Sequence, residues 1–159
     1  MDKRKLITTF IDQLAHDIQA LKETAKATIE AATNEESRPE NEYDTRGLEA
    51  SYLARGQAKR VAEMEEVLVL LKHLNPKDFG PDDGISSSAL VEVEHNNKRS
   101  FFFILALGGG MSVPFEGKSI QIVTPSSPLG EALLDQKAGG IAVVETGSQV
   151  REYDILNIW

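Results

Sequence analysis

The sequence predicts an α+β protein in two parts, and two observations support this. Residues 1–75 contain only two glycines and one proline, whereas the remainder is rich in glycine, proline, valine and isoleucine. The spacing of apolar residues changes at the same place, from alternating steps of three and four, typical of helices, to the alternation typical of strands. We therefore predict an antiparallel α-helical hairpin (a coiled coil) over residues 1–75, a linker over residues 76–88 and a small β-sheet domain with one helix over residues 89–159.

Each of the two predicted helices, over residues 3–33 and about 43–74, carries a single seam of apolar or small residues. Neither helix has another surface on which to bury this seam, so we expect the two to fold back on each other. Large side chains lie at the end of the hairpin near residue 75 and small ones at the far end, which should therefore be thin. The seams comprise Ile7, Ile11, Leu14, Ile18, Leu21, Ala25, Thr28 and Ala32, then Gly47, Ala50, Ala54, Gln57, Val61, Met64, Leu68 and Leu71.

The segment that joins the helices, at about residues 33–44, is acidic and forms the tip of the hairpin. Pro39 disfavours a continuous helix there. Glu36, Glu40 and Glu42 are candidate functional carboxylates, and Glu36 with Glu40 forms a hypothetical metal-binding pair. Mg²⁺ commonly takes one or two carboxylates and completes its shell with water and phosphate oxygens. The alternative is a solvated turn whose acids stabilise the N-terminus of the second helix.

The second helix carries a small group of cations. Arg55 and Lys59 are four residues apart, and Arg60 follows directly. These three residues are candidates for contact with RNA phosphates or with an acidic protein wall. The simpler interpretation is a solvated helix face on which Lys59 lies near Glu63, and we favour it.

The second half of the chain predicts a small antiparallel or mixed sheet packed on one helix. Residues 89–94 alternate apolar and polar side chains, and Asn96 and Asn97 supply a hairpin turn. Residues 100–107 are almost entirely apolar and should form a central strand covered on both faces. Further strands are expected at residues 119–124, 141–145 and 153–159. Between them, Ser127 and Pro128 are typical of a helix start, and glycines at 139–140 are typical of its end.

Several functional classes are excluded or disfavoured. The net charge is −8, and both halves are acidic, so neither is a general nucleic-acid-binding surface. The chain has no cysteine, and its three histidines are scattered, so a zinc site is not expected. The segment at residues 117–119 reads Gly-Lys-Ser, but it lacks the upstream glycine and the following helix of a phosphate-binding loop. No run of apolar residues is long enough to cross a membrane, and we expect a cytoplasmic protein.

Residues 127–159 resemble the C-terminal domain of the bacterial Gre transcript-cleavage factors, a family of transcription elongation factors. The resemblance rests on the Ser-Pro-Leu-Gly helix start, a Val-rich strand, a short turn and a last strand reading Tyr-Asp-Ile-Leu-Asn-Ile. The family's Gly-Asp turn stands here as Gly139 and Gly140. At the tip, the family pattern Asp-x-x-Glu-Asn-x-Glu-Tyr is approximated by residues 40–43, with Glu36 as the nearest upstream acid.

The resemblance implies an FKBP-like fold for the C-terminal domain and RNA polymerase as the partner. Ser127 and Pro128 would contact the polymerase, and the hairpin would enter its secondary channel. Glu36, Glu40 and Glu42 would then approach the active-site Mg²⁺, stimulating cleavage of backtracked RNA. The protein would not itself be an enzyme and would hold no stable cofactor. It would meet nascent RNA only within the polymerase complex, and we expect a monomer with no membrane association.

Three alternatives remain open. The protein could occupy the polymerase channel without stimulating cleavage, because the tip departs from the family pattern in the spacing of its acids. The FKBP-like domain could isomerise prolyl bonds, although aromatic residues for a proline pocket are few. The hairpin could be a purely structural or oligomerising coiled coil.

Overall fold

The computed structural model describes residues 1–34, 39–40 and 46–159 of the 159-residue chain. Contacts divide it into two compact units, one formed by residues 1–11 with residues 70–159 and the other by residues 12–69. The division falls inside two long helices, α1 (Lys3–Thr33) and α2 (Arg46–His73), rather than near residue 75. The reason is that the first turns of α1 pack on the sheet, where Phe10 stacks on Phe103 with ring centroids 6.1 Å apart.

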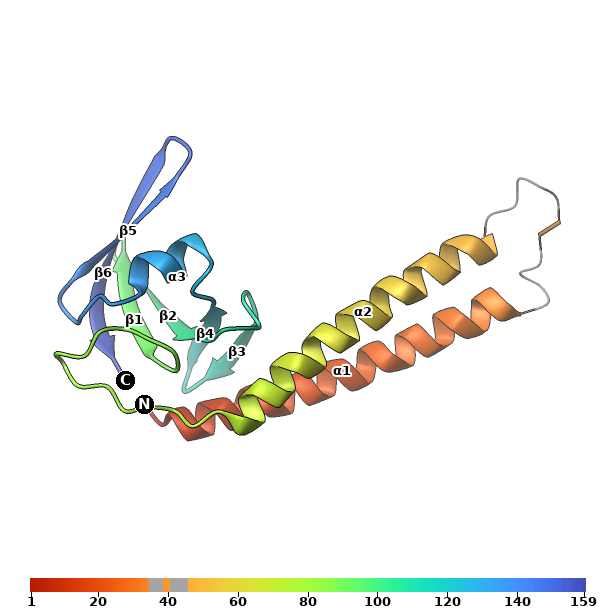
Figure 1. Cartoon of the computed structure of the whole chain (residues 1–159), viewed down its shortest axis with the longest axis horizontal. Helices are drawn as coiled ribbons and strands as arrows, with labels where there is room; N and C mark the ends of the chain where they lie inside the picture. The colour runs from red at the N-terminus through yellow and green to blue at the C-terminus, as the bar shows by residue number, and fades with distance from the viewer. Residues whose placement is uncertain (35–38, 41–45) are drawn as a thin grey trace. The chain divides into compact units, whose positions relative to one another are not determined.

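The unit of residues 12–69 consists of the remaining parts of α1 and α2, which run side by side in opposite directions (Figure 1). Lys22 and Glu65 join the two helices by an ion pair of 2.6 Å. Every seam residue whose side chain the structure describes, along the whole of both helices, is buried or half-buried, as the spacing predicts. Towards the tip, the larger apolar side chains are exposed, namely Ile29, Leu48, Tyr52 and Leu53.

The other unit contains a six-stranded mixed sheet in the order β3-β4-β2-β1-β6-β5. Its strands β2 and β4 are parallel, and all other neighbours are antiparallel. Asn96 and Asn97 form the expected turn between β1 and β2, both with positive φ. The elements are β1 (Leu90–His95), β2 (Lys98–Ile104), β3 (Ser112–Phe115), β4 (Lys118–Val123), α3 (Pro128–Leu133), β5 (Ile141–Thr146) and β6 (Gln149–Ile158).

The sheet of this unit is covered on both faces. Phe10 lies against Phe103 on one face, and Leu133 of α3 joins a buried cluster with Val91 and Val93 on the other. Strand β2 is therefore central and doubly covered, as predicted. The other members of the cluster are Ile85, Ala89, Ile104, Val123, Ala142 and Ile155.

Two details differ from the sequence prediction. Strand β3 was not expected, because its four residues include Pro114 and follow three consecutive glycines. It forms at the edge of the sheet, where a proline is tolerated.

Helix α3 ends at Leu133, and the first positive φ after it belongs to Asp135 (63°), whereas Gly139 takes its positive φ in the turn before β5. The first residue with a positive φ after the helix is therefore an aspartate and not a glycine.

Candidate functional site

Helix α3 begins with a tightly specified turn. The Ser127 hydroxyl accepts a hydrogen bond from the Gly130 backbone N–H (3.1 Å) and donates one to the Thr124 carbonyl (2.7 Å). Pro128 occupies the first helical turn, where its missing N–H costs nothing, and it is exposed to solvent. The Ser127 side chain is therefore engaged in capping the helix, whereas Pro128 presents its ring to the surface.

Gly130 is required by close packing rather than by its backbone angles. A Cβ at this position would lie 1.9 Å from the Thr124 carbonyl oxygen, far inside any tolerated contact. The absence of a side chain lets α3 lie directly on the segment that leaves β4. This explains in physical terms why a glycine follows the serine and the proline in this run.

Ser127, Pro128 and Leu129 form one side of a docking hollow of about 560 Å³. The hollow lies between the start of α3 and the face of the sheet that α3 covers. It combines two aromatic side chains, Phe102 and Tyr153, with a cation, Arg151. Its other lining residues are Gly109, Gly110, Gln121, Ile122, Val123, Thr124, Val144 and Thr146. Apolar and aromatic side chains with a few polar groups are the usual lining of a ligand-binding pocket.

Ser127 and Pro128, the two residues predicted to contact a partner, both line this hollow. The hairpin tip is described only in part. Of the tip carboxylates, Glu36 and Glu42 lie outside the described residues, and Glu40 is exposed. Arg55, Lys59 and Arg60 are all exposed on α2. The guanidinium of Arg55 lies 5.8 Å from the ring of Tyr52, so this face of α2 carries both charge and an aromatic surface.

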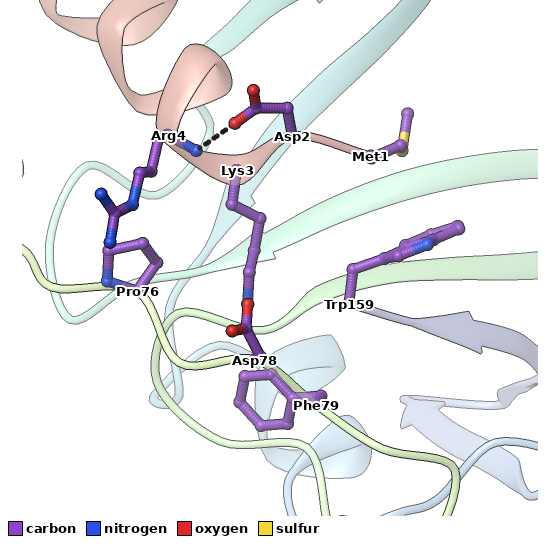
Figure 2. Close-up of a pocket in the computed structure, with 8 residues that line it drawn as sticks. All are labelled: Met1, Asp2, Lys3, Arg4, Pro76, Asp78, Phe79 and Trp159. Atoms are coloured by element: carbon purple, nitrogen blue, oxygen red, sulfur yellow. Dashed lines mark hydrogen bonds between the residues drawn. The ribbon is translucent and has the colours of Figure 1, made fainter.

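Sequence reasoning missed a buried lysine at the start of α1. Lys3 reaches from α1 to the segment after α2, where its ammonium donates to the Lys77 carbonyl and to the Ser88 carbonyl (3.1 Å). The same group lies 4.7 Å from the ring centroid of Phe79. Figure 2 shows the side chain of Lys3 directed towards Asp78 and Phe79, and Trp159 lines the same small cavity.

Burial dominates the electrostatics of Lys3. It lowers the pKa of the ammonium from 10.5 to about 8, and the Asp78 carboxylate opposes this shift. A signal for this burial was present in the sequence. Lys3 precedes Leu6, Ile7 and Phe10 by three, four and seven residues, which places it on the buried face of the helix.

The parts of the chain that the structure describes contain no cluster of three His, Asp or Glu side chains able to hold a metal ion. Within the same residues, no helix combines the length and the apolar character needed to cross a membrane.

The comparisons with known proteins find similarity to proteins described as transcription elongation factors. No family model matches the sequence. The chain is 24% identical to the transcription elongation factor GreA of Neisseria meningitidis serogroup B, over 99% of its own length and 98% of that protein. The sequence similarity therefore spans both compact units.

Solved structures of similar proteins include GreA factor homolog 1 of Thermus thermophilus. It is 19% identical, with a TM-score of 0.37 and coverage of 94% of each chain. The homologous factor of Thermus aquaticus gives 19% identity and a TM-score of 0.38, covering 95% of this chain and 94% of that one. A GreA/GreB factor from Nitrosomonas europaea is 15% identical, with a TM-score of 0.36, and covers 60% of this chain and 78% of its own.

Proposed function

We propose that this protein is a Gre-type accessory factor that binds RNA polymerase during transcript elongation. The observation that carries the proposal is the similarity to GreA, which extends over nearly the full length of both proteins. The Ser-Pro-Leu-Gly start of α3 supports it, because the run that resembles the Gre factors is the one that borders the docking hollow. The protein would act on the polymerase and would not itself be an enzyme.

In this proposal the docking hollow receives the polymerase. Pro128 is exposed and Leu129 half-buried, so both offer apolar surface to a partner. The Ser127 hydroxyl is already committed to Thr124 and Gly130. The role of Ser127 would therefore be to hold Pro128 and Leu129 in position, and the apolar contact would come from its two neighbours.

The hairpin of α1 and α2, proposed to be a coiled coil, would enter the secondary channel of the polymerase. Glu36, Glu40 and Glu42 would approach the active-site Mg²⁺ and stimulate cleavage of backtracked RNA. The acidic composition of the tip supports this role, since carboxylates are ligands that Mg²⁺ prefers. The proposal further assigns the sheet and α3 to an FKBP-like fold.

The test is a cleavage assay on backtracked elongation complexes, run beside a pull-down of purified polymerase. We expect binding and Mg²⁺-dependent cleavage with the unaltered protein. Replacing Glu36→Ala with Glu40→Ala should abolish cleavage without weakening binding, because the tip is distant in sequence from the hollow. The matched control replaces Glu63→Ala with Glu66→Ala, two exposed acids of α2, and should retain cleavage.

Binding without cleavage would favour the alternative of a regulator that occupies the channel. Failure to bind polymerase would contradict the proposal as a whole. A prolyl isomerase is a second candidate, because Phe102 and Tyr153 both line the hollow and could face a proline ring. A prolyl-peptide assay with no acceleration over buffer would dismiss it.

A further inference from the structure

A second hollow, of about 440 Å³, lies where β2 and β4 begin. We call it the cationic hollow, because Lys98, Arg99 and Lys118 line it and no carboxylate does. Its remaining lining residues are Ser100, Phe101, Phe102, Gly117, Ser119 and Gln121.

The parallel pairing of β2 and β4 explains why these residues meet. Parallel strands begin at the same edge of a sheet, so the Lys-Arg-Ser start of β2 and the Lys-Ser start of β4 lie together. The register pairs Phe101 with Ile120. The preceding residues, Ser100 and Ser119, therefore occupy neighbouring positions although they are far apart in the sequence.

The three cations differ in their availability to a ligand. Arg99 is held by two carboxylates, at 3.1 Å from Glu92 and 3.5 Å from Glu94. Lys98 and Lys118 are both exposed, and neither forms an ion pair with any residue that the structure describes. The ammonium of Lys118 lies 4.6 Å from the ring centroid of Phe101, which restricts its position. Two ammonium groups thus remain free to bind an anion.

The hydroxyl groups complete a set of donors. In the described parts of the chain, the side chains of Ser100 and Ser119 have no hydrogen-bond partner. Ammonium and hydroxyl groups are the donors that bind phosphate oxygens in proteins. The turn before β4 has positive φ at both Glu116 (49°) and Gly117 (74°). Glu116 does not line the hollow, so its carboxylate is not among the groups that an anion would meet there.

We propose that the cationic hollow binds a phosphate group at the end of the two strands, with Lys98, Ser100 and Ser119 as donors from one face of the sheet and Lys118 from the other. The site differs from a phosphate-binding loop, because the Gly-Lys-Ser run leads into a strand and the donors come from two parallel strands. The phosphate has two sources with the same chemistry, a nucleic-acid backbone and a free diphosphate. This assignment does not depend on binding of RNA polymerase.

The test is an NMR titration of the full chain, isotopically labelled, with inorganic pyrophosphate and separately with a short single-stranded RNA, both at low salt. We expect shifts of the amides at residues 98–100 and 117–119. Exposed ion pairs contribute at most about 1 kcal/mol each and are screened by salt, so we expect weak binding that falls as the salt concentration rises. If the RNA binds more tightly than pyrophosphate, the source of the phosphate is a nucleic-acid backbone. If pyrophosphate binds equally tightly or more tightly, the source is a free diphosphate.

The decisive variant combines Lys98→Ala with Lys118→Ala and should weaken binding about tenfold or more. The control combines Lys26→Ala with Lys137→Ala, which removes the same charge from exposed sites elsewhere. Equal weakening in both variants would mean that only net charge matters and would overturn the site. Shifts absent from residues 98–100 and 117–119 would overturn it as well. The thermal midpoint of each variant shows whether the fold is retained.

Discussion

Gly130 and Lys3 show how single residues shape the unit that contains the sheet. Gly130 lets α3 rest on the Thr124 carbonyl, and Lys3 ties the start of α1 to the segment after α2. Lys3 contacts residues 74 and 85 positions away in the sequence, whereas Gly130 contacts Thr124, which precedes it in the same segment. Their consequences for stability can be measured one residue at a time.

Replacing Gly130→Ala should destabilise this unit by about 1–3 kcal/mol, because the new Cβ would overlap backbone atoms that cannot move cheaply. The control is Gly56→Ala in the middle of α2, where no atom lies within 4 Å of the added Cβ. That change should stabilise the helix by about 0.5–1 kcal/mol. Urea denaturation followed by Trp159 fluorescence and by circular dichroism measures both, and equal effects would contradict the packing argument.

The pKa of Lys3 predicts a specific dependence of stability on pH. Since burial lowers this pKa from 10.5 to about 8, between these pH values the unfolded chain binds a proton that the folded chain does not. The contribution of Lys3 to stability should therefore increase as the pH rises from 8 to 10.5. Lys3→Met should remove this increase. Carbon NMR at Cε should show a titration midpoint near 8, and a midpoint near 10.5 would contradict the prediction.

At the scale of elements, burial along the hairpin is uneven. Leu14 is fully buried, whereas Leu53, nearer the tip, is 58% exposed. The alternation of three and four residues predicts which face of each helix is buried. The same spacing continues along the whole hairpin, so spacing by itself does not predict the exposed fraction of each side chain. The amount of cover depends on the size of the side chains that meet across the two helices.

Leu14→Ala should destabilise the hairpin by about 2–5 kcal/mol, because it leaves a cavity among buried side chains. Leu53→Ala makes the same chemical change at an exposed position and should stay within about 0.5 kcal/mol. Helix circular dichroism in urea measures the difference. Similar losses for both variants would show that cover by the partner helix does not control stability here.

For the whole molecule, the question is whether the hollow beside α3 is the surface that binds polymerase. Pro128→Glu should abolish co-purification with polymerase, because it places a charge on the apolar edge of the docking hollow. The fold should survive, since Pro128 is exposed and an acid is favourable at a helix start. Pro81→Glu, at another exposed proline, is matched in charge and should bind normally. Normal binding by both variants would move the interface elsewhere.

The sequence by itself determined the helices, most of the strands and the start of α3. These features depend on local spacing and on capping residues such as Ser127, whose effects act within one or two turns. Tertiary structure decided the rest. Strand β3 exists because β4 pairs with it, and Ser100 meets Ser119 because β2 and β4 are parallel. The packing of residues 1–11 on the sheet was likewise hidden, since it depends on Phe10 meeting Phe103 across more than ninety residues of chain. Contacts between distant segments are chosen by the packing of whole faces, which no local pattern specifies.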